Sequence, residues 1–117
     1  MKTILIVEDT ELNIDLMTQL LEDDYKLIFA RDGAEGVTMA SRQQPDLILM
    51  DITLPVIDGY EATRRIREAK ETMPIIGLSA HAMDEHEDKA REAGCDDYLT
   101  KPIDDQLLFA MLNKYLG

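Results

Sequence analysis

Cysteine is nearly absent from this chain of 117 residues, with Cys95 as its single example. One cysteine excludes an internal disulfide and any zinc site built from several cysteines. The residues beside it, Gly94 and Asp96-Asp97, supply no positive charge that would lower the pKa of the thiol. We therefore expect Cys95 to be a buried or incidental thiol and not a nucleophile.

Basic residues are scarce as well, because 12 lysines and arginines stand against 24 aspartates and glutamates, for a net charge of −12. This balance argues against direct binding of nucleic acid, since phosphate binding needs a basic patch. It favours metal cations or basic proteins as partners, and it is also typical of an ordinary solvated acidic surface.

Long hydrophobic runs are missing too. No apolar run approaches the length needed to span a bilayer, and the stretch that follows Met1-Lys2-Thr3 is too short for the core of a signal peptide. The sequence thus predicts a cytoplasmic protein without membrane contact. Its length and its hydrophobic content of 45% suit one domain that covers residues 1–117.

What the chain does contain is a regular alternation of short apolar runs and amphipathic segments. Strands are expected at residues 3–7, 25–30, 47–51, 73–78 and 97–100. Helices are expected at residues 11–22, 34–43, 60–69, 83–93 and 103–116. Such alternation is typical of a three-layer α/β sandwich. We predict a parallel sheet of five strands with helices on both faces, and if the first and third strands are neighbours, it has the doubly wound, flavodoxin-like order 2-1-3-4-5.

The side-chain pattern also predicts how three of the helices face the sheet. Thr10 is a candidate cap for helix 11–22, whose apolar residues at helical spacing are Leu12, Ile14, Leu16, Met17, Leu20 and Leu21. In helix 60–69 we expect an exposed Thr63-Arg64-Arg65 face and a buried face of Ala62, Ile66 and Ala69. The last helix places at core spacing Leu107, Leu108, Met111, Leu112 and Tyr115.

Polar and charged side chains stand where four of these strands end. They are Glu8 and Asp9 after the first strand, Asp51 at the end of the third, Ser79 after the fourth and Lys101 after the fifth. Because parallel strands end at a common edge, where ligands bind in open α/β sheets, we expect these side chains to converge. Crowded carboxylates need a compensating cation, and their oxygen atoms suit Mg²⁺. Carboxylate, cation, lysine and hydroxyl are the parts needed to transfer a phosphoryl group to an aspartate.

Each of these residues has a structural alternative when it is taken alone. Glu8 and Asp9 fit the acidic start of a helix, and Asp51 fits a helix cap or a turn. Ser79 fits a turn, and Lys101 fits a solvated charge. Their joint occurrence at strand ends favours a site. His81 and His86 are expected to be surface histidines and not metal ligands.

Six short motifs lie at the strand ends and in the loops that follow them: Ile6-Val7-Glu8-Asp9, Asp46-Leu47-Ile48-Leu49-Met50-Asp51, Leu54-Pro55, Asp58-Gly59, Leu78-Ser79-Ala80 and Tyr98-Leu99-Thr100-Lys101-Pro102. Together they resemble the motifs of response regulator receiver domains of two-component signalling. The resemblance covers the whole chain. A chain that runs from Met1 to Gly117 favours the stand-alone form of such a domain, with no output domain.

The resemblance implies a metal site and a phosphoacceptor. Asp51 would take a phosphoryl group from a phosphohistidine. Glu8 and Asp9, together with Asp51 and the backbone carbonyl of Thr53, would bind Mg²⁺, with Mn²⁺ as an alternative cation. Lys101 would contact the phosphoryl oxygens, and the family's cis peptide bond at Lys101-Pro102 would aim its side chain.

The resemblance also implies a switch. Ser79 would move toward the phosphoryl group, and Tyr98 matches the aromatic position that turns inward with it. A serine at Ser79, where threonine is more frequent, keeps the hydroxyl that this movement needs. Thr53 and His81 occupy positions that tune dephosphorylation in the family, so they are expected to set the phosphoryl lifetime.

We accordingly expect a single-domain response regulator in a phosphorelay, which is not an enzyme in the turnover sense. A sensor histidine kinase or a histidine phosphotransfer protein would be its phosphodonor. A downstream protein would bind the surface formed by segments 83–93, 97–100 and 103–116.

Other functions are weighed against this expectation. The main alternative is a phosphorylation-independent interaction module, because an intact pocket does not prove that it is used. A phosphatase of the haloacid dehalogenase type is disfavoured, since Thr53 stands where that family needs a second aspartate. A nucleotide-binding domain is disfavoured because no glycine-rich phosphate loop follows the first strand.

Overall fold

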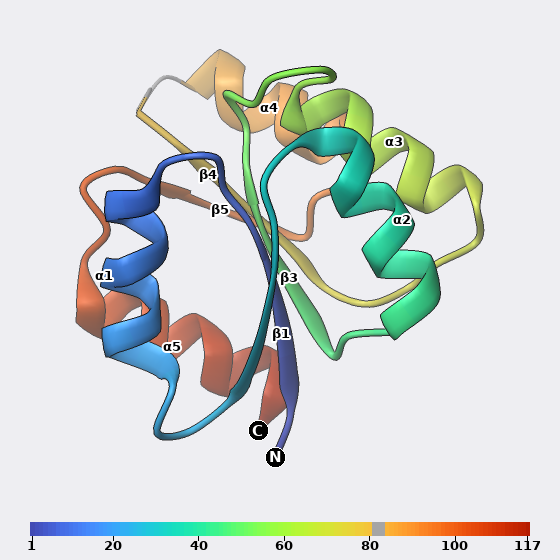
Figure 1. Cartoon of the computed structure of the whole chain (residues 1–117). Helices are drawn as coiled ribbons and strands as arrows, with labels where there is room; N and C mark the ends of the chain where they lie inside the picture. The colour runs from blue at the N-terminus through green and yellow to red at the C-terminus, as the bar shows by residue number, and fades with distance from the viewer. Residues whose placement is uncertain (81–83) are drawn as a thin grey trace.

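A five-stranded sheet with helices on both faces organises the chain (Figure 1). The computed structural model describes residues 1–80 and 84–117, and residues 84–87 only in their backbone. The strands are β1 (Thr3–Val7), β2 (Lys26–Ala30), β3 (Leu47–Asp51), β4 (Ile75–Ser79) and β5 (Asp97–Thr100). The helices are α1 (Glu11–Leu21), α2 (Gly33–Gln43), α3 (Gly59–Glu68), α4 (Asp84–Ala93) and α5 (Asp105–Leu116).

All strand pairs are parallel, and the strand order is β2-β1-β3-β4-β5. This confirms the predicted doubly wound α/β fold. The register brings the strand ends level with one another, because Asp51 pairs with Leu78 and Ser79 pairs with Thr100. The carboxyl ends of the three strands β3, β4 and β5 therefore meet at one edge, as expected for the ligand-binding edge of such a sheet.

Two apolar cores lie on opposite faces of the sheet, because side chains alternate along each strand. The α1 and α5 side is filled by Ile4, Ile6, Met17, Leu21, Leu47, Leu49, Ile76, Leu78, Leu99, Leu108 and Leu112. The α2, α3 and α4 side is filled by Leu5, Val7, Ala30, Ala40, Ile48, Met50, Ala62, Ile66, Ile75, Ala90 and Cys95. Every residue of β3 and β4 is buried, so the central strands are rigid supports for whatever stands at their ends.

Aspartate side chains begin three of the helices. Asp32 accepts a hydrogen bond from the backbone of Glu35 at 2.8 Å, and Asp58 caps α3 in the same way. Asp104 begins α5 by accepting from two backbone N–H groups. Gly94 follows α4 with a φ of +117°, a conformation that favours glycine just after a helix end. Observed and predicted element ends differ by at most two residues, except that the expected first residue of α4, residue 83, lies outside the described residues.

Some side chains face otherwise than the periodicity predicts. In α1 the buried residues are Ile14, Met17 and Leu21, whereas Leu12 and Leu16 are 66% and 50% exposed. The segment carries two overlapping helical stripes, and the sheet covers only one of them. Leu107 of α5 is likewise 48% exposed, because Leu108 and Leu112 make the contact with the core.

The predicted faces of α3 need two further corrections. Thr63 was expected at the surface but is completely buried, where its hydroxyl donates to the carbonyl of Gly59 at 2.7 Å. That local bond satisfies the polar group and makes its burial inexpensive. Ala69 was expected inside but is exposed, since it lies just past the end of α3.

Cys95 is buried as predicted. Burial raises the pKa of its thiol to about 11, so it stays protonated and unreactive at neutral pH. Among the described helices, none combines the length and the apolar character required to traverse a bilayer.

Candidate functional site

Asp51 is the last residue of β3, between the ends of β1 and β4. It is only 4% exposed. One carboxylate oxygen, Oδ1, accepts a hydrogen bond from the backbone N–H of Thr53 at 3.1 Å, and Oδ2 lies 3.3 Å from Nζ of Lys101. The side chain is therefore held in a fixed orientation, with a positive charge beside one of its oxygens.

Glu8 directly follows β1 and is 2% exposed. Its Oε1 lies 3.0 Å from Nζ of Lys101, while Oε2 accepts hydrogen bonds from the backbone N–H groups of Asp9 and Thr10. The Thr10 side chain, predicted to cap the helix that follows, makes no such hydrogen bond. The predicted cap position of Thr10 is confirmed, with extended backbone, but the side-chain hydrogen bond that usually accompanies a cap is absent.

The two buried carboxylates and the lysine perturb one another. Burial and the repulsion of nearby Glu8 raise the pKa of Asp51 to about 6 from its ordinary value of 3.8, although Lys101 opposes the rise. Burial also disfavours the charged form of Glu8, but hydrogen bonds with Lys101 and Asp51 outweigh it and hold its pKa below the usual range. Burial opposes the charge on Lys101 as well, yet both carboxylates raise its pKa. Lys101 is therefore charged throughout the neutral range.

The acidic cluster suits a divalent cation. Glu8, Asp9 and Asp51 each offer a carboxylate oxygen, and these atoms all lie within 4.8 Å of one another. Three carboxylates against the single ammonium of Lys101 leave an excess of two negative charges at neutral pH when all are ionised. Hard oxygen donors with room left for water are the ligands that Mg²⁺ prefers. The residues present therefore fit the predicted cation. The backbone carbonyl of Thr53 stays a predicted ligand.

Ser79 and Lys101 come from neighbouring strand ends. Ser79 ends β4, is 1% exposed, and accepts a backbone hydrogen bond from Lys101 at 2.7 Å. The peptide bond between Lys101 and Pro102 is cis, as the resemblance implied. Tyr98 is half-buried in β5 beside Gly77 and packs against the core on the α4 side of the sheet. Thr53 is exposed beside Asp51, while His81 and the side chain of His86 lie outside the described residues.

The model of the response regulator receiver domain family matches residues 4–113 of this chain. The chain belongs to the receiver domain family. It is also 40% identical over 119 residues to the polar-differentiation response regulator DivK of Brucella ovis, an alignment that covers 99% of this chain and 97% of DivK.

Solved structures show the same likeness for this receiver domain. The receiver domain of the sensor histidine kinase PA1611 from Pseudomonas aeruginosa, solved with a magnesium ion coordinated in its active site cleft, is 39% identical with a TM-score of 0.91. That match covers 99% of this chain and 98% of the other. The co-crystal structure of the Saccharomyces cerevisiae histidine phosphotransfer protein Ypd1 with the receiver domain of its downstream response regulator Ssk1 gives a 29% identical match with a TM-score of 0.92. It covers 97% of this chain and 88% of the matched chain.

Sequence reasoning missed the part that Gly59 plays in the receiver domain's site. A Cβ atom at this position would lie 2.2 Å from the carbonyl oxygen of Asp51 and 2.7 Å from Cα of Ile52. Only glycine lets α3 approach the backbone of Asp51 this closely. The Asp58-Gly59 pair signals a helix start in the sequence, but nothing in the sequence shows which backbone the glycine touches.

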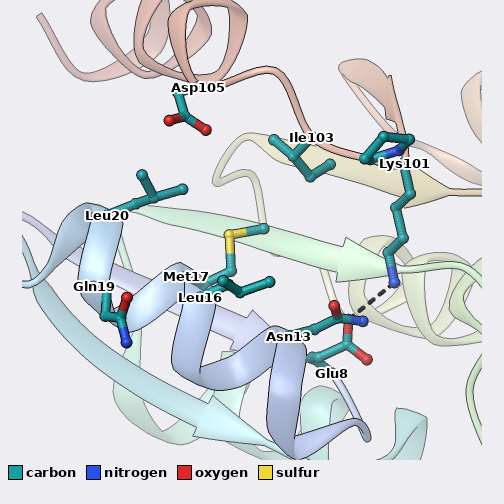
Figure 2. A pocket seen from close by; sticks show the side chains of 10 residues that line it. Glu8, Asn13, Leu16, Met17, Gln19, Leu20, Lys101, Ile103 and Asp105 are labelled. Carbon is teal, nitrogen blue, oxygen red and sulfur yellow. Dashed lines mark hydrogen bonds and ion pairs between the residues drawn. The ribbon is translucent and has the colours of Figure 1, made fainter.

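A groove opens beside the ion pair of the receiver domain (Figure 2). It encloses about 580 Å³ between α1 and the segment that leads from Lys101 to Asp105. Glu8 and Lys101 lie at one end of it, and Gln19 and Leu20 lie farther along α1. Sequence reasoning did not foresee this groove, because its walls come from the two ends of the chain.

Proposed function

We propose that this receiver domain accepts a phosphoryl group on Asp51 from a phosphohistidine and thereby changes its affinity for a partner protein. The observation that carries the proposal is the position of the Asp51 carboxylate, fixed 3.3 Å from the Lys101 ammonium and within a cluster of three carboxylates. A buried acid so arranged is too costly to keep for packing alone, since an apolar residue would fill the space without the repulsion.

The chemistry follows from the residues around Asp51. A carboxylate oxygen attacks phosphorus, an oxygen–phosphorus bond forms, and the phosphorus–nitrogen bond of the donor breaks with its electron pair left on the imidazole. Lys101 already holds its charge beside Asp51 and offers it to a phosphoryl oxygen. Glu8 and Asp9, with Asp51, would hold Mg²⁺, which supplies positive charge that offsets the charge of the transferred group.

A partner protein can respond to phosphorylation only if the change at Asp51 also alters the surface of the domain. Ser79 ends the strand next to Asp51, and Tyr98 lies on the following strand, so both are placed to respond to a new charge at Asp51. We propose that their movement alters the surface formed by α4, β5 and α5, where a downstream protein binds. Thr53 and His81 stay predicted determinants of the phosphoryl lifetime.

The comparisons support a protein phosphodonor. DivK is by name a response regulator, and Ssk1 was crystallised with a histidine phosphotransfer protein. We propose a sensor histidine kinase or a phosphotransfer protein as the donor, a cytoplasmic location, and no turnover of external substrates. A phosphorylation-independent interaction module is the alternative.

The decisive experiment is intact-mass spectrometry after incubation with acetyl phosphate, with Mg²⁺ or with excess chelator. Wild-type protein and an Asp23→Asn control, which changes an exposed aspartate, should each gain one phosphoryl mass in Mg²⁺ only. Asp51→Asn should gain none. Labelling of Asp51→Asn would place the acceptor on another residue and contradict the proposal. No labelling of wild type, either by acetyl phosphate or by a competent histidine kinase, would favour the interaction module. A further incubation with Mn²⁺ tests the alternative cation.

A further inference from the structure

Asn13 has no part in the site described so far, yet it lies at the end of the groove where Glu8 and Lys101 form their ion pair. It belongs to the first turn of α1 and lines the groove together with Glu8 and Lys101. Figure 2 shows its side chain pointing toward the end where that ion pair lies. Within residues 1–80 and 84–117, the half-buried Asn13 amide makes no hydrogen bond. A polar group directed into a largely apolar groove without a partner is available to a ligand.

The position of Asn13 indicates which part of a phosphodonor it would meet. Asp51 is 4% exposed and Lys101 is paired with it, so a phosphoryl group must come close to both. The leaving group of an in-line transfer then stands on the far side of phosphorus from Asp51, toward the rim of the site. Asn13 lies at the Glu8 and Lys101 end of the groove, and Met17 lines the same groove, so together they offer an amide next to an apolar surface, which suits a flat ring with one N–H group.

We infer that Asn13 recognises the imidazole ring of the phosphodonor, its Oδ1 accepting a hydrogen bond from the ring N–H that lies away from phosphorus. The inference rests on the proposed function of Asp51. During transfer the phosphorus–nitrogen bond breaks, its electron pair stays on that nitrogen, and the other nitrogen keeps its proton, so imidazole leaves neutral. The hydrogen bond favours the ring-protonated donor, which has the better leaving group.

Two small donors separate this role from every other role of the site. Phosphoimidazole carries the ring, whereas acetyl phosphate delivers the same phosphoryl group from a leaving group without an N–H. Neither needs a protein docking surface. Asn13→Leu keeps the approximate size of the side chain and removes its hydrogen bonding, and Gln19→Leu is the matched control because Gln19 lines the same groove away from Lys101. Rates are followed in Mg²⁺ by intact mass.

Asn13→Leu should react about tenfold more slowly than wild type with phosphoimidazole and within about twofold of wild type with acetyl phosphate, as expected for one lost hydrogen bond to a charged group. Gln19→Leu should match wild type with both donors. Equal slowing with both donors, or no slowing, overturns the inference. Wild type that reacts with acetyl phosphate but not with phosphoimidazole also overturns it, while the proposed function stands. If wild type reacts with neither donor and is not labelled by a histidine kinase either, both the inference and the proposed function are contradicted.

Discussion

Replacement of Asp51 by asparagine should stabilise the metal-free protein at neutral pH, although it removes one partner of an ion pair. In the folded protein, burial and the repulsion of Glu8 raise the pKa of Asp51 from 3.8 to about 6. A shift of one pKa unit corresponds to about 1.36 kcal/mol, so the ionised form of Asp51 lowers the free energy of unfolding by about 3 kcal/mol. Asparagine keeps the shape and avoids the charge, so we expect a gain of about 2 kcal/mol in the free energy of unfolding.

The pH dependence follows from the direction of the pKa shift. Between about pH 4 and pH 6 the folded state binds more protons at Asp51 than the unfolded state does, so this residue's contribution to stability falls as the pH rises. Above pH 6 the full penalty is present. The difference in unfolding free energy between Asp51→Asn and wild type should therefore grow from pH 4 to pH 6.5 and then stay constant.

Thermal unfolding followed by circular dichroism, with excess chelator and from pH 4 to pH 8, measures this difference. For a chain of 117 residues, about 2 kcal/mol corresponds to a rise of roughly 8 °C in the midpoint at pH 7.5. Asp23→Asn, which changes an exposed aspartate, should shift the midpoint by less than about 2 °C. Mg²⁺ should narrow the gap, because cation binding stabilises wild type more. The reasoning would be refuted if the midpoint of Asp51→Asn were at or below that of wild type at pH 7.5. It would also be refuted if the difference between the two midpoints did not change with pH.

Three further substitutions test the scaffold by urea denaturation. Gly59→Ala should lower the free energy of unfolding by about 3 kcal/mol, since the new Cβ meets the backbone of Asp51; an unchanged midpoint would contradict that close approach. Arg67→Ala should lower the free energy of unfolding by about 2–3 kcal/mol, because the Arg67 guanidinium donates to three backbone carbonyls and a carboxylate. The control Arg64→Ala, at an exposed position, should lower it by less than about 0.5 kcal/mol. Equal losses in the two variants would contradict this prediction. Val56→Asn should raise the free energy of unfolding by about 1 kcal/mol, because Val56 is exposed with a φ of +70°, a conformation that asparagine adopts more readily than valine. A loss of stability in this variant would show that the valine is not strained.

The sequence alone predicted the strands and the polar residues at their ends, and the reason is physical. Buried parallel strands must be short continuous apolar runs, so each run and the polar residue that ends it are legible without coordinates. Glu8, Asp51 and Lys101 were found in this way. Right-handed crossovers then leave few topologies, and the order 2-1-3-4-5 is one of them.

The sequence could not predict which of two stripes on α1 is buried. Leu12 and Leu16 are as apolar as Ile14 and Met17, and only the position of the sheet and α5 decides which pair is covered. Thr63 is a similar case, because its burial depends on a bond to the carbonyl of Gly59 four residues earlier. Local patterns carry the period of a helix, whereas its rotation about its own axis is set by packing against other elements.

The chemistry of the site divides in the same way. The sequence determined that carboxylates, a lysine and a hydroxyl end the parallel strands. Only the tertiary structure decided that one ammonium serves both Glu8 and Asp51, that Gly59 lies against the Asp51 backbone, and that Asn13 faces the same groove. Residue types and their order are local properties of the chain, whereas pKa values, close approaches and grooves arise from atoms that are distant in the sequence and meet only when the chain has folded.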